Sequence, residues 1–337
     1  MGMPTDSLLS PDSAPGAAPV SVLLDVDTGV DDALAILFAV AHPGINLLGV
    51  SCVAGNAALP QVMINTLKVL DAAGAGDIPV AGDASRPLLA PARDASHVHG
   101  ADGLGGVELP ETNRRALDIG AVEMLRQQLE AAAEPVTIIA LAPQTNLALL
   151  LRTYPEVAPK IARVIFMGGS ASVGNATAVA EFNVWHDPEA AAIVLDSGIR
   201  TFMYGLDVFN LVSVPQQTAV ALQSSDSRAE RLAGNLLAHR IGVGADKEPV
   251  YTGLIGDAGA VCALVDPDAL VIERLPVFVE LGGTSRGQTV VDRRQFPGED
   301  ALHGLHAQVG LTDVALKVDA ERYVELFLST IATLDWR

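Results

Sequence analysis

The sequence has few aromatic residues and few basic ones. Phenylalanine, tryptophan and tyrosine make up 4% of its 337 residues, and 21 lysines and arginines face 40 aspartates and glutamates, a net charge of −19. Binding to a phosphate backbone needs clustered cationic side chains, so this balance excludes nucleic acid as an expected partner and disfavours anionic membranes. Half of the residues are apolar, so we expect a large core built mainly from Ala, Val, Leu and Ile.

Cysteine is almost absent, and so are long apolar runs. Cys52 and Cys262 each lie in a short apolar stretch, so we expect two buried free thiols in a reducing cytoplasm and no disulfide. No stretch is long and uncharged enough to span a membrane. Residues 1–19 have neither a basic start nor an apolar centre, and they predict a disordered leader before a single domain over residues 20–337.

From residue 20 onward, short apolar runs alternate with segments whose apolar residues recur at helical spacing. The runs typical of buried strands are at 21–24, 45–53, 78–80, 136–141, 164–167 and 201–204, and the helical segments are at 31–40, 60–73, 119–133, 145–152 and 188–196. This alternation predicts an α/β fold with a mostly parallel, doubly wound sheet flanked by helices. Further along, 216–240 indicates one helical segment, and 282–310 a loop with a short strand at 289–292.

Four aspartates cluster where the first of these strands ends. Asp25, Asp27, Asp31 and Asp32 lie in the segment LLDVDTGVDDA, which covers the carboxyl end of the strand and the first turn of the next helix. Like charges this close repel one another, so a positive charge is needed to compensate them. A helix N-terminus supplies about half a charge, whereas a divalent cation supplies far more. Oxygen-only ligands indicate a hard cation, Ca²⁺ or Mg²⁺.

An N-cap, an EF-hand loop and a phosphatase site each account for the acidic segment incompletely. N-capping accounts for one or two aspartates but not four, and an EF-hand loop needs a glutamate where Ile36 stands. A Mg²⁺-dependent phosphatase of the haloacid dehalogenase type would use Asp25 as nucleophile and Asp27 as acid/base. That family usually has a Gly-Thr pair after the second aspartate, whereas the order here is Thr28-Gly29. That family also needs a lysine or arginine later in the sequence to neutralise the phosphate, and lysine is scarce here.

Residues 25–33 resemble the DxDxGxDDA hallmark of the inosine–uridine type of nucleoside hydrolases. Further segments similar to that family's motifs follow in order: VAGN at 53–56, HG at 99–100, ALAPQTN at 140–146, MGG at 167–169, GNATAVAEFN at 174–183 and DPEAA at 187–191. The resemblance runs from residue 20 to the C-terminal region. It implies an enzyme that hydrolyses the bond between the ribose and the base of a small-molecule ribonucleoside, and that forms a homo-oligomer, a dimer or a tetramer.

The resemblance also implies a set of metal ligands. Asp27, Asp32, the backbone carbonyl of Leu141 and the late aspartate Asp257 would hold one Ca²⁺, which tolerates seven or eight oxygen ligands. The ion would hold a water molecule and ribose hydroxyls, and Asp27 would accept the proton from that attacking water. The glycosidic bond would break through a ribose cation resembling an oxocarbenium ion.

The substrate itself would be bound, by the same resemblance, by Asp31, Asn56, Met167, Asn175, Glu181, Phe182 and Asn183. The Met167 sulfur would lie under the ribose, where a polarizable atom meets developing positive charge. Glu181 and Asn183 flank Phe182 in an alternating pattern typical of a strand, which would aim both polar side chains the same way.

One position departs from the family's pattern. Many members have a histidine just before the late metal aspartate, and purine-preferring ones can have a tryptophan, but Gly256 stands here. His99 is the expected substitute as acid for the departing base. The other candidates for this role or for the base pocket are His97, Trp185, His239, Tyr251, His303 and His306. The base preference stays open, and so does the alternative of a ribose- or nucleoside-binding protein without turnover.

Overall fold

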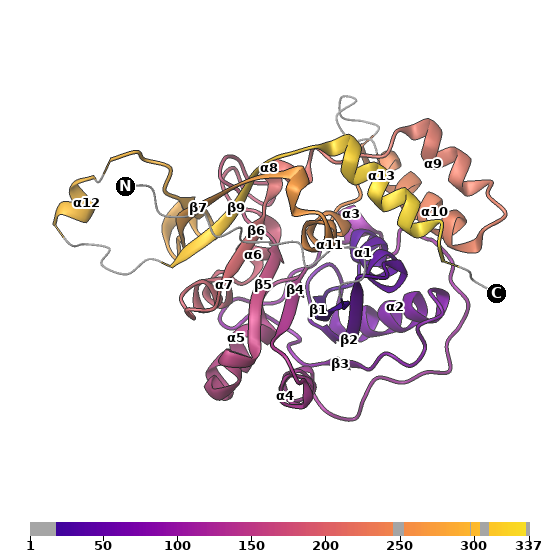
Figure 1. The fold of residues 1–337 in the computed structure, drawn as a ribbon, viewed down its shortest axis with the longest axis horizontal. Coiled ribbons are helices and arrows are strands. Elements are labelled where there is room, and N and C mark those ends of the chain that lie inside the picture. The colour runs from indigo at the N-terminus through magenta and orange to yellow at the C-terminus, as the bar shows by residue number, and fades with distance from the viewer. Residues whose placement is uncertain (1–17, 245–252, 297, 304–309, 335–337) are drawn as a thin grey trace.

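The fold is built on one mixed β-sheet. The computed structural model describes residues 18–244, 253–296, 298–303 and 310–334. Within them the strands are β1 (Val20–Val26), β2 (Ile45–Cys52), β3 (Val80–Gly82), β4 (Val136–Ala140), β5 (Ile161–Met167), β6 (Thr201–Tyr204), β7 (Leu270–Val279), β8 (Thr289–Val291) and β9 (Leu311–Val318). Their order is β3-β2-β1-β4-β5-β6-β9-β7-β8 (Figure 1). Neighbours from β3 to β9 are parallel, whereas β7 is antiparallel to β9 and β8.

Helices cover both faces of this sheet. The α-helices of the described chain are α1 (Val30–Ala41), α2 (Leu59–Ala72), α3 (Ser96–His99), α4 (Ala121–Ala131), α5 (Thr145–Thr153), α6 (Phe182–His186), α7 (Pro188–Leu195), α8 (Leu206–Phe209), α9 (Gln216–Gln223), α10 (Arg228–Gly244), α11 (Ala258–Val265), α12 (Glu299–Leu302) and α13 (Ala320–Ile331). Short 3₁₀ turns lie at Pro155–Lys160, Pro267–Ala269 and Gly283–Ser285. No helix of the described chain has the length and apolar character that crossing a membrane requires.

Two hydrophobic clusters, one on each face, explain why the strand segments are mostly apolar. Successive residues of a strand point to opposite faces, so Leu24 and Ile139 join one cluster while Leu23 and Ile138 join the other. Helices α1, α2, α10, α11 and α13 contribute to the first cluster, and α4, α5 and α7 to the second. A sheet buried on both faces favours apolar side chains on both sides of each strand, without the alternation of a half-exposed strand. The doubly wound, mostly parallel architecture is confirmed.

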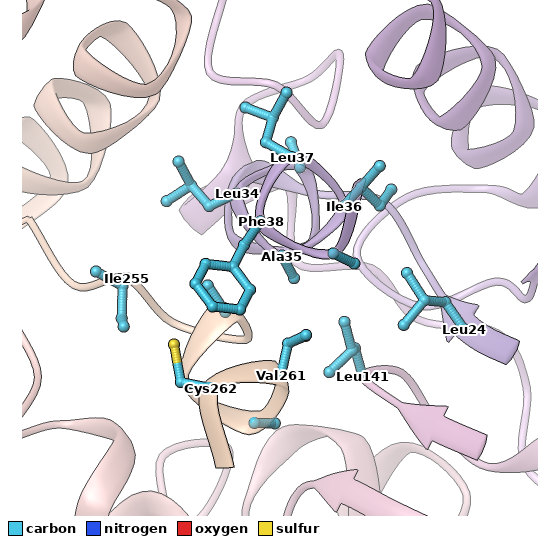
Figure 2. Packing of buried hydrophobic residues seen from close by; sticks show 14 of the residues in the cluster. Leu24, Leu34, Ala35, Ile36, Leu37, Phe38, Leu141, Ile255, Val261 and Cys262 are labelled. Carbon is cyan, nitrogen blue, oxygen red and sulfur yellow. The ribbon is translucent and has the colours of Figure 1, made fainter. Parts of the chain in front are cut away.

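Helix α1 is buried on all sides. Its residues from Val30 to Ala39 are all buried, and Figure 2 shows Leu34, Ile36 and Leu37 pointing away from its axis in different directions. Phe38 points toward Cys262 of α11 in the same view. Burying one large aliphatic side chain stabilises a fold by roughly 1.5–3 kcal/mol, so α1 is held firmly. Its first turn, which carries two of the clustered aspartates, is therefore fixed in place.

The acidic segment lies where the strand order reverses. The chain runs from β1 outward to β2 and β3 and then returns to β4 on the other side of β1. Asp25 pairs with Ser51 of β2 and with Ala140 of β4, so the carboxyl ends of three strands meet at one edge. Open α/β sheets bind their ligands at such a point. The ends of β1, β2 and β4 supply Asp27, Asn56 and Leu141 to this edge.

Some predicted elements need correction. The segment 216–240 is two helices, α9 and α10, because Ser225 and Ser227 turn the chain between them through side-chain hydrogen bonds to backbone N–H groups and to Glu230. Strands β7 and β9 and helix α13 were not predicted. The free, buried state of Cys52 and Cys262 is confirmed. Residues 1–17 of the predicted leader, Tyr251 and His306 lie outside the described residues.

Candidate active site

A cavity of about 890 Å³ lies at the sheet edge where the strand order reverses. This volume is in the range of small-molecule sites. The predicted site residues among its lining are Asp31, Asn56, His99, Leu141, Met167, Asn175, Glu181, Phe182, Asn183 and Asp257. Asp27 and Asp32 are not in the lining, and both are completely buried. They lie behind it, bonded to Asn56.

Asn56 joins the two deepest aspartates. Its backbone N–H donates to Oδ2 of Asp27 at 2.7 Å, and its Nδ2 donates to Oδ1 of Asp27 at 2.9 Å. The same Nδ2 lies 3.1 Å from Oδ2 of Asp32. Asp32 also accepts from the backbone N–H groups of Gly29, at 2.9 Å, and Asp27, at 3.3 Å. A residue expected to bind ribose thus also orients both carboxylates.

The aspartates form a group that calls for a cation. Ligand atoms of Asp31, Asp32 and Asp257 lie within 4.8 Å of one another, and all three residues are buried. Burial, followed by repulsion from Asp31, raises the pKa of Asp32 to about 7. Burial and repulsion from Asp32 raise the pKa of Asp27 well above its usual value. Carboxylates this close and this buried are stable as anions only beside positive charge, so the donor set fits a hard divalent cation.

The grouping differs in one member from the predicted ligand set. Asp31 stands in the group of three in place of Asp27, whose side chain is in direct hydrogen-bond contact with Asp32 and shares Nδ2 of Asn56 with it. The carbonyl of Leu141, the fourth predicted ligand, accepts a hydrogen bond from Nδ2 of Asn183 at 2.9 Å.

The segment 181–183 is not a strand. Glu181 is the N-cap of α6, and its carboxylate accepts from the backbone N–H groups of Asn183 at 2.8 Å and Val184 at 3.1 Å. It also accepts from Gly169 at 3.0 Å. The prediction was wrong because an N-cap residue, like a strand residue, has extended backbone. Glu181 therefore holds α6 against the MGG segment at the cavity.

Asn183 and Asn175 are both tied to the surrounding chain. Nδ2 of Asn183 donates to the Met167 carbonyl at 3.1 Å and lies 3.5 Å from the Met167 sulfur. Asn175 lies on an exposed part of the cavity wall, where its Oδ1 accepts from the backbone N–H of Phe182 at 2.9 Å. These bonds fix the residues expected to surround the ribose.

His99 is buried on α3 beside the aspartates. Its Nδ1 accepts from the backbone N–H of Val30 at 3.2 Å and lies 3.6 Å from Oδ1 of Asp31. Because Nδ1 is an acceptor in this arrangement, the neutral ring carries its proton on Nε2. His239 holds the same helix in place, since its Nε2 lies 3.0 Å from the Val98 carbonyl. His239 is thus a support for α3 and not a cavity residue.

Of the remaining candidates, His97 and Trp185 line the cavity. His303 directly follows α12, and its Nε2 is 3.2 Å from a carboxylate oxygen of Glu299 in that helix. Asp25, the nucleophile in the phosphatase hypothesis, accepts from Ser51 and Asn146 and is not in the cavity lining.

The backbone conformation and the close neighbours of position 256 explain why a glycine, and not a histidine, precedes Asp257. Its φ is +58°, a conformation that L side chains rarely adopt, and a Cβ at this position would lie 2.4 Å from Cβ of Asp31. The backbone here is therefore built around a glycine, and no side chain at this position can act as an acid.

Two residues of the site region were missed from the sequence. Arg93 lines the cavity with its guanidinium carbon 4.2 Å from the Trp185 ring centroid. Asp187 accepts from the backbone N–H of Leu88 at 2.9 Å and from the Thr145 hydroxyl at 2.8 Å, so it ties the loop that precedes Arg93 to α7. Asp187 belongs to the DPEAA motif, which could have flagged it. Arg93 lies in a loop, where neither a motif nor a periodic spacing of residues marks it in the sequence.

Glu181 should make stability depend on pH. Burial raises its pKa to about 7 despite the N–H groups that donate to it. Since the folded pKa lies above the unfolded one, the free energy of unfolding should fall as pH rises from the ordinary value of 4.5 to about 7. This group should lower the free energy of unfolding of the wild type by about 3 kcal/mol over that pH range, and Glu181→Gln should abolish this decrease. Urea unfolding of both proteins at pH 4.5 and 8 measures this difference.

Glu189 provides the control for that experiment. Its hydrogen bond with Arg286 lowers the pKa of its carboxyl. The ionised carboxylate therefore stabilises the fold at neutral pH and less so as pH falls, the opposite of Glu181. Glu189→Gln should remove this stabilisation. A wild type and an E181Q variant with parallel pH dependences would contradict the prediction.

Comparisons with known proteins point to one family. The family model of inosine-uridine preferring nucleoside hydrolases matches residues 22–325. A pyrimidine-specific ribonucleoside hydrolase, RihA, from Citrobacter koseri is 38% identical over 313 residues, which cover 92% of this chain and 97% of the relative. The RihA of Shewanella baltica is 38% identical over 307 residues, 89% of this chain and 96% of the relative.

Solved structures agree as well. A purine-preferring ribonucleoside hydrolase from Gardnerella vaginalis has a TM-score of 0.85 at 28% identity, covering 93% of this chain and 98% of the other. A plant nucleoside hydrolase has a TM-score of 0.86 at 29% identity, covering 93% and 99%. The protein belongs to the inosine-uridine preferring nucleoside hydrolase family, whose enzymes cleave the N-glycosidic bond of ribonucleosides.

Proposed function

We propose that this protein hydrolyses pyrimidine ribonucleosides to ribose and free base. The observation that carries the proposal is the buried group of Asp31, Asp32 and Asp257, placed at a cavity of about 890 Å³ where the strand order reverses. Support for a pyrimidine substrate comes from the relatives: those 38% identical are named pyrimidine-specific, whereas the purine-preferring structure is 28% identical.

We further propose that the group binds Ca²⁺ with the carboxylates of Asp31, Asp32 and Asp257, the Leu141 carbonyl and Asp27 as candidate ligands. A bound divalent cation supplies positive charge that makes water easier to deprotonate and balances the buried carboxylates. The resemblance also predicts a homo-oligomer, whose subunit number sedimentation equilibrium would give, and the two free thiols favour a reducing cytoplasm as its location.

The side chains then divide the reaction between them. Asp27, oriented by two hydrogen bonds from Asn56, accepts a proton from the attacking water. The water oxygen bonds to C1′ of the ribose as the bond from C1′ to the base nitrogen breaks, and the electron pair of that bond leaves with the base. Asp31, Asn56 and Asn183 hold ribose hydroxyls, which fixes C1′ and disfavours 2′-deoxy substrates.

The reaction is tested with a panel of ribonucleosides and p-nitrophenyl riboside in the presence of Ca²⁺, with free ribose as the readout. Release from uridine or cytidine, with slower release from inosine, supports the proposal. Faster release from inosine contradicts the pyrimidine assignment. Nucleoside binding without release from any substrate would favour the binding-protein alternative.

Asp257→Asn should weaken both metal binding and turnover. Loss of one anionic ligand is expected to raise the Kd for Ca²⁺ about 100-fold, because the ligand charge sets the affinity of such sites. Calorimetric titration of chelator-treated protein measures the Kd, and restoration of activity by added Ca²⁺ is the matching kinetic readout. Asp266→Asn is the control, because Asp266 lies at the other end of α11 and pairs with Arg322. Unchanged calcium binding in D257N would refute the ligand assignment.

A further inference from the structure

The aspartates of the proposed metal group lie deep in the cavity, whereas Arg93 lies on its exposed side together with Asp94. Asp31 and Asp257 are 6% and 3% exposed, whereas Arg93 lies in an exposed stretch. Among the lining residues within the described ranges, Arg93 is the one lysine or arginine. If the ribose occupies the acidic floor, as the proposed function requires, the base extends from C1′ toward the mouth where Arg93 lies.

Arg93 is held in a defined position at that mouth. Its guanidinium carbon lies 4.2 Å from the centroid of the Trp185 ring, and both residues line the cavity. A guanidinium on an aromatic face is attracted by the ring, by about 0.5–1 kcal/mol at an exposed site. The group is planar and always charged, and its N–H donors lie around its edge, so stacking on the indole leaves donors available to a ligand.

The departing base needs a positively charged hydrogen-bond donor. When the C1′–N bond breaks, its electron pair remains on the base, and a pyrimidine spreads this negative charge onto its carbonyl oxygens. No residue can donate a proton from position 256, because a Cβ there would lie 2.4 Å from Cβ of Asp31. His99 is the other candidate in the cavity lining, and because its Nδ1 accepts from the backbone N–H of Val30, the proton it can offer is the one on Nε2.

We propose that Arg93 activates the leaving base by charge. Its guanidinium donates hydrogen bonds to a carbonyl oxygen of the pyrimidine and stabilises the anion that forms as the C1′–N1 bond breaks. The electron pair goes to the base, the water oxygen goes to C1′, the proton of the water goes to Asp27, and the base takes up a proton from solvent afterwards. This inference rests on the proposed function.

The test compares two leaving groups in three variants. Arg93→Met keeps the alkyl stem but removes the charge, Arg93→Lys keeps the charge but removes the planar fork, and Arg86→Met changes an exposed arginine of the same loop outside the cavity lining. Removing a donor that stabilises developing charge costs about 100-fold in rate. We therefore expect kcat/KM for uridine to fall about 100-fold in R93M. R93K should fall less, and R86M should match the wild type.

p-Nitrophenyl riboside separates leaving-group activation from other roles. Its phenolate departs without help, so R93M should retain kcat/KM for this substrate to within about threefold. An equal loss on both substrates, or no loss on uridine, would overturn the role of Arg93 while the wild-type activity still supports the proposed function. A wild type that releases ribose from neither substrate would overturn both.

Discussion

Replacing Asp27 with asparagine is expected to lower kcat/KM for uridine about 1,000-fold, within the range for a lost general base. The substitution keeps the size of the side chain but removes the proton acceptor. It also replaces one of the two oxygens that accept from Asn56 with an NH₂ group, so two donors would face each other. Steady-state kinetics with uridine, together with a calcium titration, separates the loss of the base from a loss of metal binding.

Asp25→Asn is the matched control for this experiment. Asp25 is also buried and lies in β1, two residues before Asp27, but its Oδ1 accepts from Ser51 and Asn146, whereas Asp27 accepts from Asn56. D25N should keep most of the activity and a similar melting temperature. An active D27N beside an inactive D25N would contradict the assigned roles, because that pattern belongs to a mechanism with the first aspartate as nucleophile.

Gly256→Ala is expected to reduce kcat/KM for uridine about 100-fold, since misplacing a reacting group by about 1 Å has an effect of that size. The new Cβ would lie 2.4 Å from Cβ and 3.0 Å from Oδ2 of Asp31, so Asp31 must move. The shift disturbs the group of carboxylates and the ribose side of the cavity at once. Kinetics and the Kd for Ca²⁺ should both worsen. Gly256→His, which restores the family's usual residue, should fail for the same reason.

Gly283→Ala isolates the cost of the backbone conformation. Gly283 has a φ of +63°, close to that of Gly256, but nothing lies within 4 Å of its added Cβ. Both alanine variants should lose about 1 kcal/mol of stability from the left-handed conformation, whereas only the Gly256 variant should lose activity. Equal kinetic losses in the two variants, or full activity in G256A, would show that Asp31 does not have to move.

The sequence predicted the parts of the site that follow from local rules. The acidic segment had to lie at a strand end and a helix start, and parallel strands bring such ends to one edge of a sheet. It could not show that ligand atoms of Asp31 lie together with those of Asp32 and Asp257, because this depends on how the folded chain turns these side chains. The contact of Arg93 with Trp185 links distant loop and helix residues and leaves no periodic pattern.

The C-terminal strands show a second limit. Strand β7 has exposed and half-buried residues along most of its length and contains Pro276, so it lacks the uninterrupted apolar character of a central strand. It lies toward the edge of the sheet, where its partners are antiparallel. Local patterns that identify a doubly covered parallel strand do not identify such a strand.

The position of β9 has a consequence for how the chain matures on the ribosome. β9 is made more than a hundred residues after β6, yet it is the strand that pairs with β6 on the side away from β5. Strands β1 to β5, with the acidic segment among them, can assemble while synthesis continues. Until residues 311–318 emerge, β6 presents open N–H and C=O groups to other nascent chains. The edge of β6 therefore stays open while the whole segment between β6 and β9, Asp257 included, is synthesised.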